Sequence, residues 1–384
     1  MAETYTIRGH AAMIGDPVRM DAYAAALERV VRPGCVVLDI GTGTGMMALL
    51  ACRLGARRVF AVEPGASIHL ARAAARDSGM AGRIEFFQDL STRVELPERA
   101  DVIVCDLRGV LPPFEHHVAS IADARDRLLA PGGVLVPRSD TLYAAPVEAP
   151  EDYARIVAPW DEHARGFDLR AARRAALNAW SKVRTRPSEL LAEPAAWAVM
   201  DYATLREPDL RGALEWSASR AGTLHGVAGW FTADLAEGIG FTTGPEGPDI
   251  IYANAFFPLL EPVALEEGDT IAVEMQARLI VDEYVWVWNT RVSGPGGIKA
   301  DFRQSTFLSQ PARTEDLRKR AHDFRPVLGE QGRMDALVLG MMDGGATLQT
   351  IAHELQRRFP ARFRGWEEAL SRAARLSQAY AEEG

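Results

Sequence analysis

The sequence predicts an α/β domain with a parallel sheet, followed by an antiparallel β-barrel domain and a small C-terminal helical unit. Three observations lead to this prediction. Between Val36 and Pro137, short β-branched runs alternate with helical stretches, which is typical of a parallel sheet. Beyond Pro137, apolar and polar residues alternate along single strands, as in antiparallel sheets. The segment 315–384 has helical periodicity, interrupted at proline and glycine residues.

The parallel sheet is predicted over residues 36–137. Each of its strands is a short, almost entirely apolar run, and such strands are covered by helices on both faces of the sheet. The runs lie at 36–40, 59–63, 84–87, 102–105 and 134–136. Helical stretches at 46–54 and 67–78 follow the first two runs, as the crossover connections between parallel strands require.

The antiparallel β-barrel domain is predicted over residues 138–312. The segment 270–279 places its apolar residues on one face and Glu274, Gln276 and Arg278 on the other. Further strands are predicted at 214–219, 227–235 and 284–288. The stretch 160–182 is helical and rich in arginine, and we expect it to project from this domain as an arm.

A small helical unit is predicted over residues 313–384. Breaks are expected at Pro326, at Gly344-Gly345 and at Pro360. Thr347 caps an amphipathic helix in this prediction. The unit resembles the small winged-helix modules of the PqqD type, which bind peptides beside modifying enzymes. The alternative is a helical cap that packs on the barrel.

Composition and charge narrow the classes of function. The chain has 384 residues, 48% of them hydrophobic, and is long enough for several cores. Lys and Arg number 43 against 52 Asp and Glu, a net charge of −9, so bulk binding to nucleic acid or an anionic membrane is not expected.

Cys35, Cys52 and Cys105 form no Cys-x-x-Cys pair. Because neither a signal peptide nor a membrane-spanning run is apparent, we expect a soluble, cytoplasmic protein with reduced thiols.

A glycine-rich loop follows the first predicted strand and opens a helix. Its sequence is Gly41-Thr42-Gly43-Thr44-Gly45. Without Cβ atoms, its backbone N–H groups can approach a ligand at the positive end of a helix. A phosphate-binding P-loop needs a lysine that is missing here, and in the dinucleotide fingerprint the third glycine comes one residue later. With Asp39 before it, the loop instead resembles motif I of class I S-adenosylmethionine (SAM) methyltransferases, which implies a Rossmann-like SAM-binding domain over 36–137.

Polar residues follow the next two predicted strands. Glu63 ends the second strand, where a carboxylate can accept hydrogen bonds from both ribose hydroxyls of a nucleoside. Asp89, Leu90 and Ser91 follow the third strand, where an acid and the backbone can contact adenine. Because these segments stand at successive strand ends of one parallel sheet, they predict a single nucleoside site. We therefore expect SAM as the cofactor, with S-adenosylhomocysteine as its product.

A further motif precedes the first strand. Its sequence is His10-x-x-Met13-x-x-Asp16-x-x-Arg19. With this motif, the region 10–262 resembles the protein arginine methyltransferase family. Other stretches similar to this family lie at 122–133, 160–168 and 240–245.

The resemblance implies roles for the N-terminal residues. Residues 1–35 would form helices that cover the cofactor. Arg19 would pair with the methionyl carboxylate of SAM, in a bidentate geometry that lysine cannot copy. Met13 would flank the sulfonium, and His10 would help to close the site.

The same resemblance implies a catalytic loop with two acids. In this family two glutamates of one loop clamp the guanidinium of the substrate. Here the loop spans 105–117; Glu115 matches the second glutamate, and Asp106, shorter by one methylene, stands at the first. The residues after Asp106 differ from the Trp-Met pair of the family. The segment 248–252 stands where the family has Thr-His-Trp, so that histidine is missing.

Two carboxylates at Asp106 and Glu115 can perform the expected chemistry. Each accepts charge-assisted hydrogen bonds from a guanidinium, which fixes its plane and aims the opposite nitrogen at the methyl group. Orientation in a dry, preorganised pocket supplies most of the acceleration. A carboxylate takes the proton late, with His116 or His117 as candidate relays. Because no second ligand cluster has the spacing of a metal site, we expect no metal.

These features predict a SAM-dependent N-methyltransferase of arginine-methyltransferase architecture. We expect methyl transfer to a guanidinium nitrogen of a protein or peptide arginine or of a free guanidino compound, and a homodimer formed through the arm at 160–182. The missing histidine and the segment Ile250-Ile251-Tyr252 favour one alternative, a small-molecule N- or O-methyltransferase with a more apolar acceptor pocket. A SAM- or peptide-binding regulator without turnover is the other alternative. We expect neither nucleic acid nor membrane as a partner.

Overall fold

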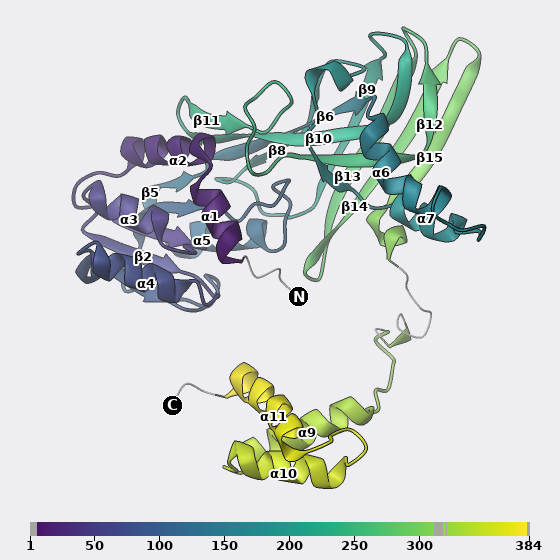
Figure 1. The fold of residues 1–384 in the computed structure, drawn as a ribbon. Coiled ribbons are helices and arrows are strands. Elements are labelled where there is room, and N and C mark those ends of the chain that lie inside the picture. The colour runs from purple at the N-terminus through teal and green to yellow at the C-terminus, as the bar shows by residue number, and fades with distance from the viewer. Residues whose placement is uncertain (1–5, 311–317, 320, 382–384) are drawn as a thin grey trace. The chain divides into compact units, whose positions relative to one another are not determined.

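The structure is a computed structural model that describes residues 6–310, 318–319 and 321–381. It divides into two compact units, Met1–Pro311 and Ala312–Gly384, which are described separately (Figure 1). The first unit contains the N-terminal helices, the parallel sheet and the antiparallel strands. The second contains the C-terminal helices.

Five parallel strands form the first sheet, in the order β3-β2-β1-β4-β5. They are β1 (Val36–Ile40), β2 (Arg58–Val62), β3 (Ile84–Phe87), β4 (Ala100–Cys105) and β5 (Leu129–Val136), and the helices between them are α3 (Met46–Arg53), α4 (Ile68–Asp77), η1 (Ala81–Arg83) and α5 (His117–Arg127). The predicted parallel sheet with apolar, buried strands is confirmed. β5 begins before the predicted 134–136. Its pairing with β4 shifts register there, because Gly132, with φ 76°, interrupts the extended backbone.

The reversal of strand order in this sheet creates a crevice. From β1 the chain continues outward to β2 and β3, and then returns to β4 and β5 on the other side of β1. The connections after β1 and β4 therefore leave in opposite directions, which opens a crevice at the carboxyl ends of these two strands. Ile40 and Cys105 end the strands in register with each other. Gly41 and Asp106 therefore enter the same crevice.

Two antiparallel sheets form the rest of the first unit. One has the strand order β7-β12-β10-β6-β8, with β11 paired to β10, and the other has the order β15-β14-β13-β9. The strands are β6 (Ser139–Val147), β7 (Ser181–Val183), β8 (Ala195–Asp201), β9 (Leu210–Ser217), β10 (Gly222–Ala236), β11 (Ile239–Thr242), β12 (Asn254–Leu265), β13 (Thr270–Ile280), β14 (Glu283–Gly294) and β15 (Gly297–Ser305). The sheets share one core, in which Phe257 of β12 packs on Trp286 and Trp288 of β14. The barrel thus consists of two sheets whose described strands are not joined into one hydrogen-bonded ring.

The predicted arm at 160–182 is not a single helix. The segment contains the end of α6 (Pro150–Asp161), then α7 (Arg170–Ala176) and the start of β7. Arg165 and Gly166 separate the two helices, because both have positive φ, 50° and 83°. The helices pack against each other and lie beside the barrel strands (Figure 1). The turn between them leaves Phe167 74% exposed.

The N-terminal helices connect the parallel sheet with the barrel. They are α1 (Ile7–Ile14) and α2 (Pro17–Val30). Asp16 caps α2, since its Oδ1 accepts the N–H of Arg19 at 3.1 Å. Its other oxygen, Oδ2, accepts the N–H of Ile251 at 2.6 Å, in the segment before β12. Because α2 also packs on β10 and β11, it holds Arg19 at the crevice.

The second unit consists of helices in its described part. They are α9 (Glu330–Asp343), α10 (Leu348–Arg358) and α11 (Trp366–Tyr380), and they share an apolar core that includes Val338, Ile351 and Ala373. Thr347 caps α10 as predicted, accepting the N–H of Thr350 at 3.2 Å. The described residues of this unit include no strand, so they contain no wing of a winged-helix module. Across both units, none of the described helices is long and apolar enough to cross a bilayer.

Candidate functional site

A cavity of about 690 Å³ opens at the carboxyl end of the parallel sheet. Its wall comes from the glycine loop, the ends of β2 and β4, the N-terminal helices and the start of α5. Most of the predicted site residues line it: His10, Met13, Arg19, Asp39, Gly41, Gly43, Glu63, Leu90, Ser91, Asp106 and Glu115. Gly45 and Asp89 are not among the lining residues. The structure therefore brings the predicted cofactor residues and both predicted acids to one cavity.

The glycines of the loop serve different purposes. Gly41, Gly43 and Gly45 all have positive φ, at 70°, 55° and 91°, which other residues adopt only with strain. A Cβ atom on Gly43 would lie 2.9 Å from Cε1 of His10, so the loop and α1 meet closely at the cavity. A Cβ atom on Gly45 would lie 3.0 Å from the Cβ atom of Ala71. Gly45 therefore allows α3 to pack on α4, away from the cavity.

Two acids hold the glycine loop in shape. Oδ2 of the buried Asp39 accepts hydrogen bonds from Thr42 Oγ1 at 2.6 Å and from the N–H of Ala48 at 3.0 Å. Glu63 accepts the N–H of Gly43 at 3.1 Å through Oε2 and that of Gly65 at 2.8 Å through Oε1. A carboxylate has about four acceptor positions, so Glu63 can still accept hydrogen bonds from a ligand in the cavity.

Residues 89–91, predicted to contact adenine, divide between the cavity and the surface. Leu90 and Ser91 line the cavity. Asp89 accepts the N–H of Leu90 at 2.7 Å and lies 3.8 Å from Arg93, with nearly half of its side chain exposed. Asp89 therefore shapes the turn after β3.

Asp106 is surrounded by donors. Its Oδ2 accepts Nε of Arg19 at 2.6 Å and the hydroxyl of Tyr252, and its Oδ1 accepts Nη1 of Arg108 at 3.0 Å. Burial by itself would raise the pKa of Asp106, but the charges of Arg19 and Arg108 outweigh it and lower the pKa to about 2. At neutral pH Asp106 is therefore a buried carboxylate compensated by two guanidinium groups. Arg19 also donates through Nη1 to the carbonyl of Met13 at 3.2 Å.

Glu115 lies near the other end of the loop 105–117, the acid loop, and lines the same cavity. Its φ of 41° is unusual for a residue with a side chain. Nε2 of the next residue, His116, lies 3.0 Å from Oδ1 of Asp282, at the tip of the β13–β14 hairpin. His117 points elsewhere: its Nε2 lies 2.9 Å from the hydroxyl of the buried Tyr202. The two histidines therefore contact different parts of the barrel.

Comparisons with known proteins concern the same region. Residues 138–281 match the family model of the arginine methyltransferase oligomerization subdomain, and residues 23–146 match that of ribosomal protein L11 methyltransferase (PrmA). Protein arginine N-methyltransferase 2 of Mus musculus is 32% identical over 284 residues, 69% of this chain and 63% of that protein. Arginine N(omega)-methyltransferase of Streptomyces achromogenes subsp. streptozoticus is 31% identical over 283 residues, 70% of this chain and 75% of that protein. The chain belongs to the protein arginine methyltransferase family.

The fold agrees with this family. The structure of Arabidopsis thaliana protein arginine methyltransferase 10 superposes with a TM-score of 0.69 at 25% identity, covering 78% of this chain and 97% of that one. The predicted order of a Rossmann-like domain followed by a barrel is confirmed. The matches to the mouse and human relatives span only 63% and 65% of those proteins.

Beside the cavity lie two buried polar residues that no motif predicts, Arg108 and Asp140. Arg108 is 1% exposed and Asp140 is 0% exposed. Nε of Arg108 donates to Asp140 at 2.8 Å. One signal for Arg108 is present in the sequence: it is the only charged residue between Asp106 and Glu115. A charge in such an apolar stretch indicates a buried partner. The identity of that partner depends on the fold.

The prediction that Ile250-Ile251-Tyr252 makes the acceptor pocket apolar is wrong. None of these three residues is among those that line the cavity. Ile250 and Tyr252 are buried in the core, where Tyr252 stacks on Phe241 with ring centroids 5.8 Å apart. The hydroxyl of Tyr252 contacts Asp106, so the segment contributes a polar group to the site.

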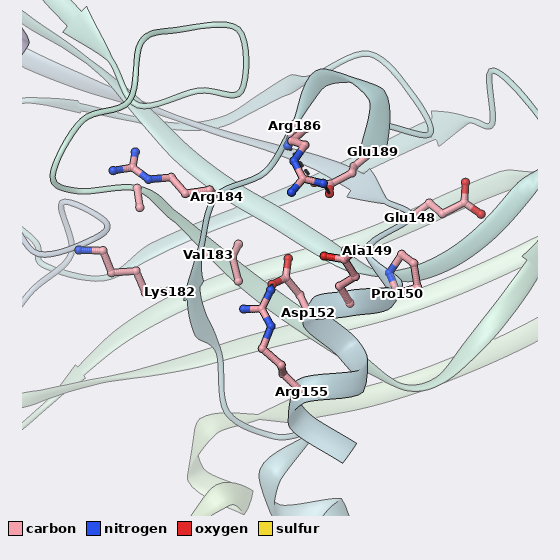
Figure 2. A pocket seen from close by; sticks show the side chains of 12 residues that line it. Glu148, Ala149, Pro150, Asp152, Arg155, Lys182, Val183, Arg184, Arg186 and Glu189 are labelled. Carbon is pink, nitrogen blue, oxygen red and sulfur yellow. Dashed lines mark hydrogen bonds and ion pairs between the residues drawn. The ribbon is translucent and has the colours of Figure 1, made fainter. Parts of the chain in front are cut away.

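A second cavity, of about 650 Å³, lies between the start of α6, β7 and the turn η2 (Pro187–Glu189). Figure 2 shows the charged side chains around it. Asp152 and Arg155 pair at 2.8 Å, and Nζ of Lys182 donates to the carbonyl of Ile251 at 2.7 Å. None of its lining residues lines the first cavity. In the described part of the chain, no group of three or more His, Cys, Asp or Glu residues could hold a metal ion.

Replacing Asp39 by Asn is expected to change how stability depends on pH. Burial raises the pKa of Asp39 from 3.8 to about 6, against the hydrogen bonds from Thr42 and Ala48. Between about pH 4 and 6 the folded state therefore binds a proton more readily than the unfolded state, so this group's contribution to stability falls as pH rises. Relative to wild type, Asp39→Asn should gain about 3 kcal/mol between pH 4 and pH 7. Urea titrations measure this difference; a difference that stays constant with pH would contradict it.

Proposed function

We propose that this arginine methyltransferase transfers a methyl group from SAM to a guanidinium nitrogen. One observation carries the proposal: a single cavity is lined by the glycine loop, by Arg19, and by both Asp106 and Glu115. The first two elements suit a nucleoside with a carboxylate group, and the acids suit a cationic acceptor.

The residues of the cavity fit SAM. Glu63 stands at the end of β2, where its oxygens would accept the ribose hydroxyls, and Leu90 and Ser91 would contact adenine. Arg19 uses Nε for Asp106 and Nη1 for the carbonyl of Met13, so its other terminal nitrogen, Nη2, would hold the methionyl carboxylate through both of its hydrogens. His10 and Met13 of α1 would cover the site. When bound, SAM supplies an electrophilic methyl group on a sulfonium.

The acids have separate roles in this proposal. Glu115 would hold the acceptor guanidinium, fix its plane and take its proton late in the reaction. Asp106 is already compensated by Arg19 and Arg108. It would therefore orient Arg19 and offer the acceptor at most one further hydrogen bond.

The acceptor is proposed to be an arginine, either in a protein or peptide or as the free amino acid. The names of the mouse and Streptomyces relatives include both kinds, a protein arginine methyltransferase and an arginine methyltransferase. A small-molecule N- or O-methyltransferase is the alternative. It is favoured by the two guanidinium groups on Asp106, which weaken the attraction of this acid for a third.

The test incubates the full chain and methyl-labelled SAM with three classes of acceptor. These are free L-arginine, arginine-rich peptides, and small amines and alcohols without a guanidino group. We expect label on the guanidino nitrogen of one of the first two, located by fragmentation mass spectrometry. Label confined to the third class would replace the proposal by the alternative, and the absence of any transfer would favour a regulator without turnover.

Replacing Gly43 by Ala is expected to weaken SAM binding. The new Cβ atom would lie 2.9 Å from Cε1 of His10 and so displace the imidazole from the cavity wall. Gly79→Ala is the matched control, because Gly79 also has positive φ, 69°, but has open space around the added atom. Since crowding costs on the order of 1–3 kcal/mol, we expect the Kd of SAM to rise about tenfold or more in Gly43→Ala only. Titration calorimetry measures both; equal Kd values in the two variants would contradict the prediction.

We further propose that two copies assemble through the arm formed by α6 and α7. The match of 138–281 to an oligomerization subdomain supports this proposal, as does the exposed Phe167 at the turn between the helices. Sedimentation velocity of the full chain tests it, since the mass of a single copy would contradict it.

The free thiols of Cys35, Cys52 and Cys105 support a reducing compartment, and we propose the cytoplasm.

A further inference from the structure

One buried carboxylate of the barrel is linked to both ends of the acid loop, residues 105–117. Asp140, in β6, is fully buried. Its two oxygens accept Nε and Nη2 of Arg108 at 2.8 and 3.0 Å. Its Oδ2 also accepts the hydroxyl of Tyr202 at 2.5 Å, and Tyr202 in turn contacts His117. Arg108 stands near the start of the loop and His117 at its end.

At the start of the loop, Arg108 fixes Asp106. Nη1 of Arg108 donates to Oδ1 of Asp106 at 3.0 Å and to the hydroxyl of Tyr23 at 2.7 Å. Its other two nitrogens donate to Asp140, so the planar guanidinium is held on every side. It also lies 5.6 Å from the ring centroid of Phe231. Arg108 is therefore a rigid link between Asp140 and Oδ1 of Asp106, whose Oδ2 is held by Arg19 and Tyr252.

At the other end, Tyr202 fixes His117. The hydroxyl of Tyr202 donates its only hydrogen to Asp140, so its oxygen accepts the N–H of His117 Nε2. Burial and the charge of Arg108 lower the pKa of His117 to about 3, so the ring is neutral. His117 begins α5, two residues after Glu115. Because Glu115 holds a strained φ of 41°, its position depends on how the start of the helix is anchored.

We propose that Asp140 is a positioning residue which, through Arg108 and Tyr202, sets the placement of Asp106 relative to Glu115. This rests on the proposed function only in assigning the two acids to the acceptor. A buried ion pair usually adds little stability over apolar residues of similar volume. We therefore expect the pair of Arg108 and Asp140 to act by holding the acid loop in position and not by adding stability. A displacement of about 1 Å at a reacting group can lower the rate a hundredfold.

The first test is Tyr202→Phe, which breaks the link to His117 and keeps the pair of Arg108 and Asp140. The matched control is Tyr153→Phe, because Tyr153 is also buried and its hydroxyl donates to the carbonyl of Leu260 at 3.1 Å. We expect kcat to fall about tenfold in Tyr202→Phe only. The Kd of SAM should stay within about twofold of wild type in both variants. Equal kcat in both variants would overturn the role of Tyr202.

The second test removes both charges together. Arg108→Met combined with Asp140→Leu keeps similar volumes and leaves no unpaired buried charge, so this double variant should fold. We expect faster amide hydrogen exchange confined to 106–117 in the double variant and in Tyr202→Phe. Unchanged exchange over 106–117 in both would overturn the proposal.

Hydrogen exchange needs no acceptor, which separates this proposal from the proposed function. If the wild type methylates no guanidinium, the proposed function fails and the exchange result still decides whether Asp140 positions the loop. If the wild type methylates arginine and the variants show neither faster exchange nor lower kcat, the positioning role fails and the proposed function stands.

Discussion

Glu115→Gln is expected to lower kcat/KM for the arginine acceptor on the order of a thousandfold, with the Kd of SAM unchanged. Gln is nearly isosteric with Glu, but it carries no charge to hold a guanidinium and cannot take up its proton. The loss of a charge-assisted pair and of a proton acceptor supports this magnitude. Because Glu115 is proposed to hold the acceptor and not SAM, cofactor binding should not respond.

Initial rates with labelled SAM and calorimetric Kd values measure this effect. Glu148→Gln is the matched control. Glu148 lines the second cavity and accepts hydrogen bonds from Arg220 at 2.6 Å and from the N–H of Thr223 at 2.8 Å. Its replacement should leave kcat/KM within about twofold of wild type. A Glu115→Gln variant as active as Glu148→Gln would show that Glu115 does not hold the acceptor.

Arg19→Gln is expected to raise the Kd of SAM at least about a hundredfold. Arg19 is buried at the cavity between Asp106 and the space proposed for the methionyl carboxylate. Each hydrogen bond to a charged group contributes roughly 1.5–3 kcal/mol, and two are lost. Asp106 keeps Arg108 and Tyr252 as partners, so the fold should survive.

Arg19→Lys separates charge from geometry. Lysine keeps the charge but loses the planar fork, so it cannot bridge Asp106 and a cofactor carboxylate at once. We expect a Kd between those of wild type and Arg19→Gln, measured by calorimetry, with thermal unfolding as the check on folding. A Kd of Arg19→Gln within about threefold of wild type would show that Arg19 serves only Asp106.

The features predicted from sequence are those that depend on neighbouring residues. The glycine loop needs positive φ at Gly41 and Gly43, and only glycine adopts this conformation without strain, so the loop can be recognised from its composition. The strand-end position of Glu63 follows in the same way from apolar runs. The break in the arm was missed because alanine and arginine favour helix on both sides of Gly166, while the turn depends on that residue and the one before it.

The partners of the acid loop could not be predicted in this way. Asp106 meets Arg19 and Tyr252, which are 87 and 146 residues away in sequence. Such contacts arise only when the N-terminal helix, the parallel sheet and the barrel have assembled. The family resemblance identifies Asp106 as an acid of the loop, but only the packed structure shows that Arg19 and Arg108 both bind it.

The walls of the first cavity have a consequence for turnover. Arg19, Glu63 and Leu90 are proposed to contact the carboxylate, the ribose and the adenine, and the reaction leaves all three groups unchanged. The spent cofactor keeps these contacts and loses only a methyl group and one positive charge. We therefore expect S-adenosylhomocysteine to compete with SAM for the proposed site. On the proposed function, sustained methylation would require a reaction that consumes this product, such as hydrolysis of its thioether-linked nucleoside.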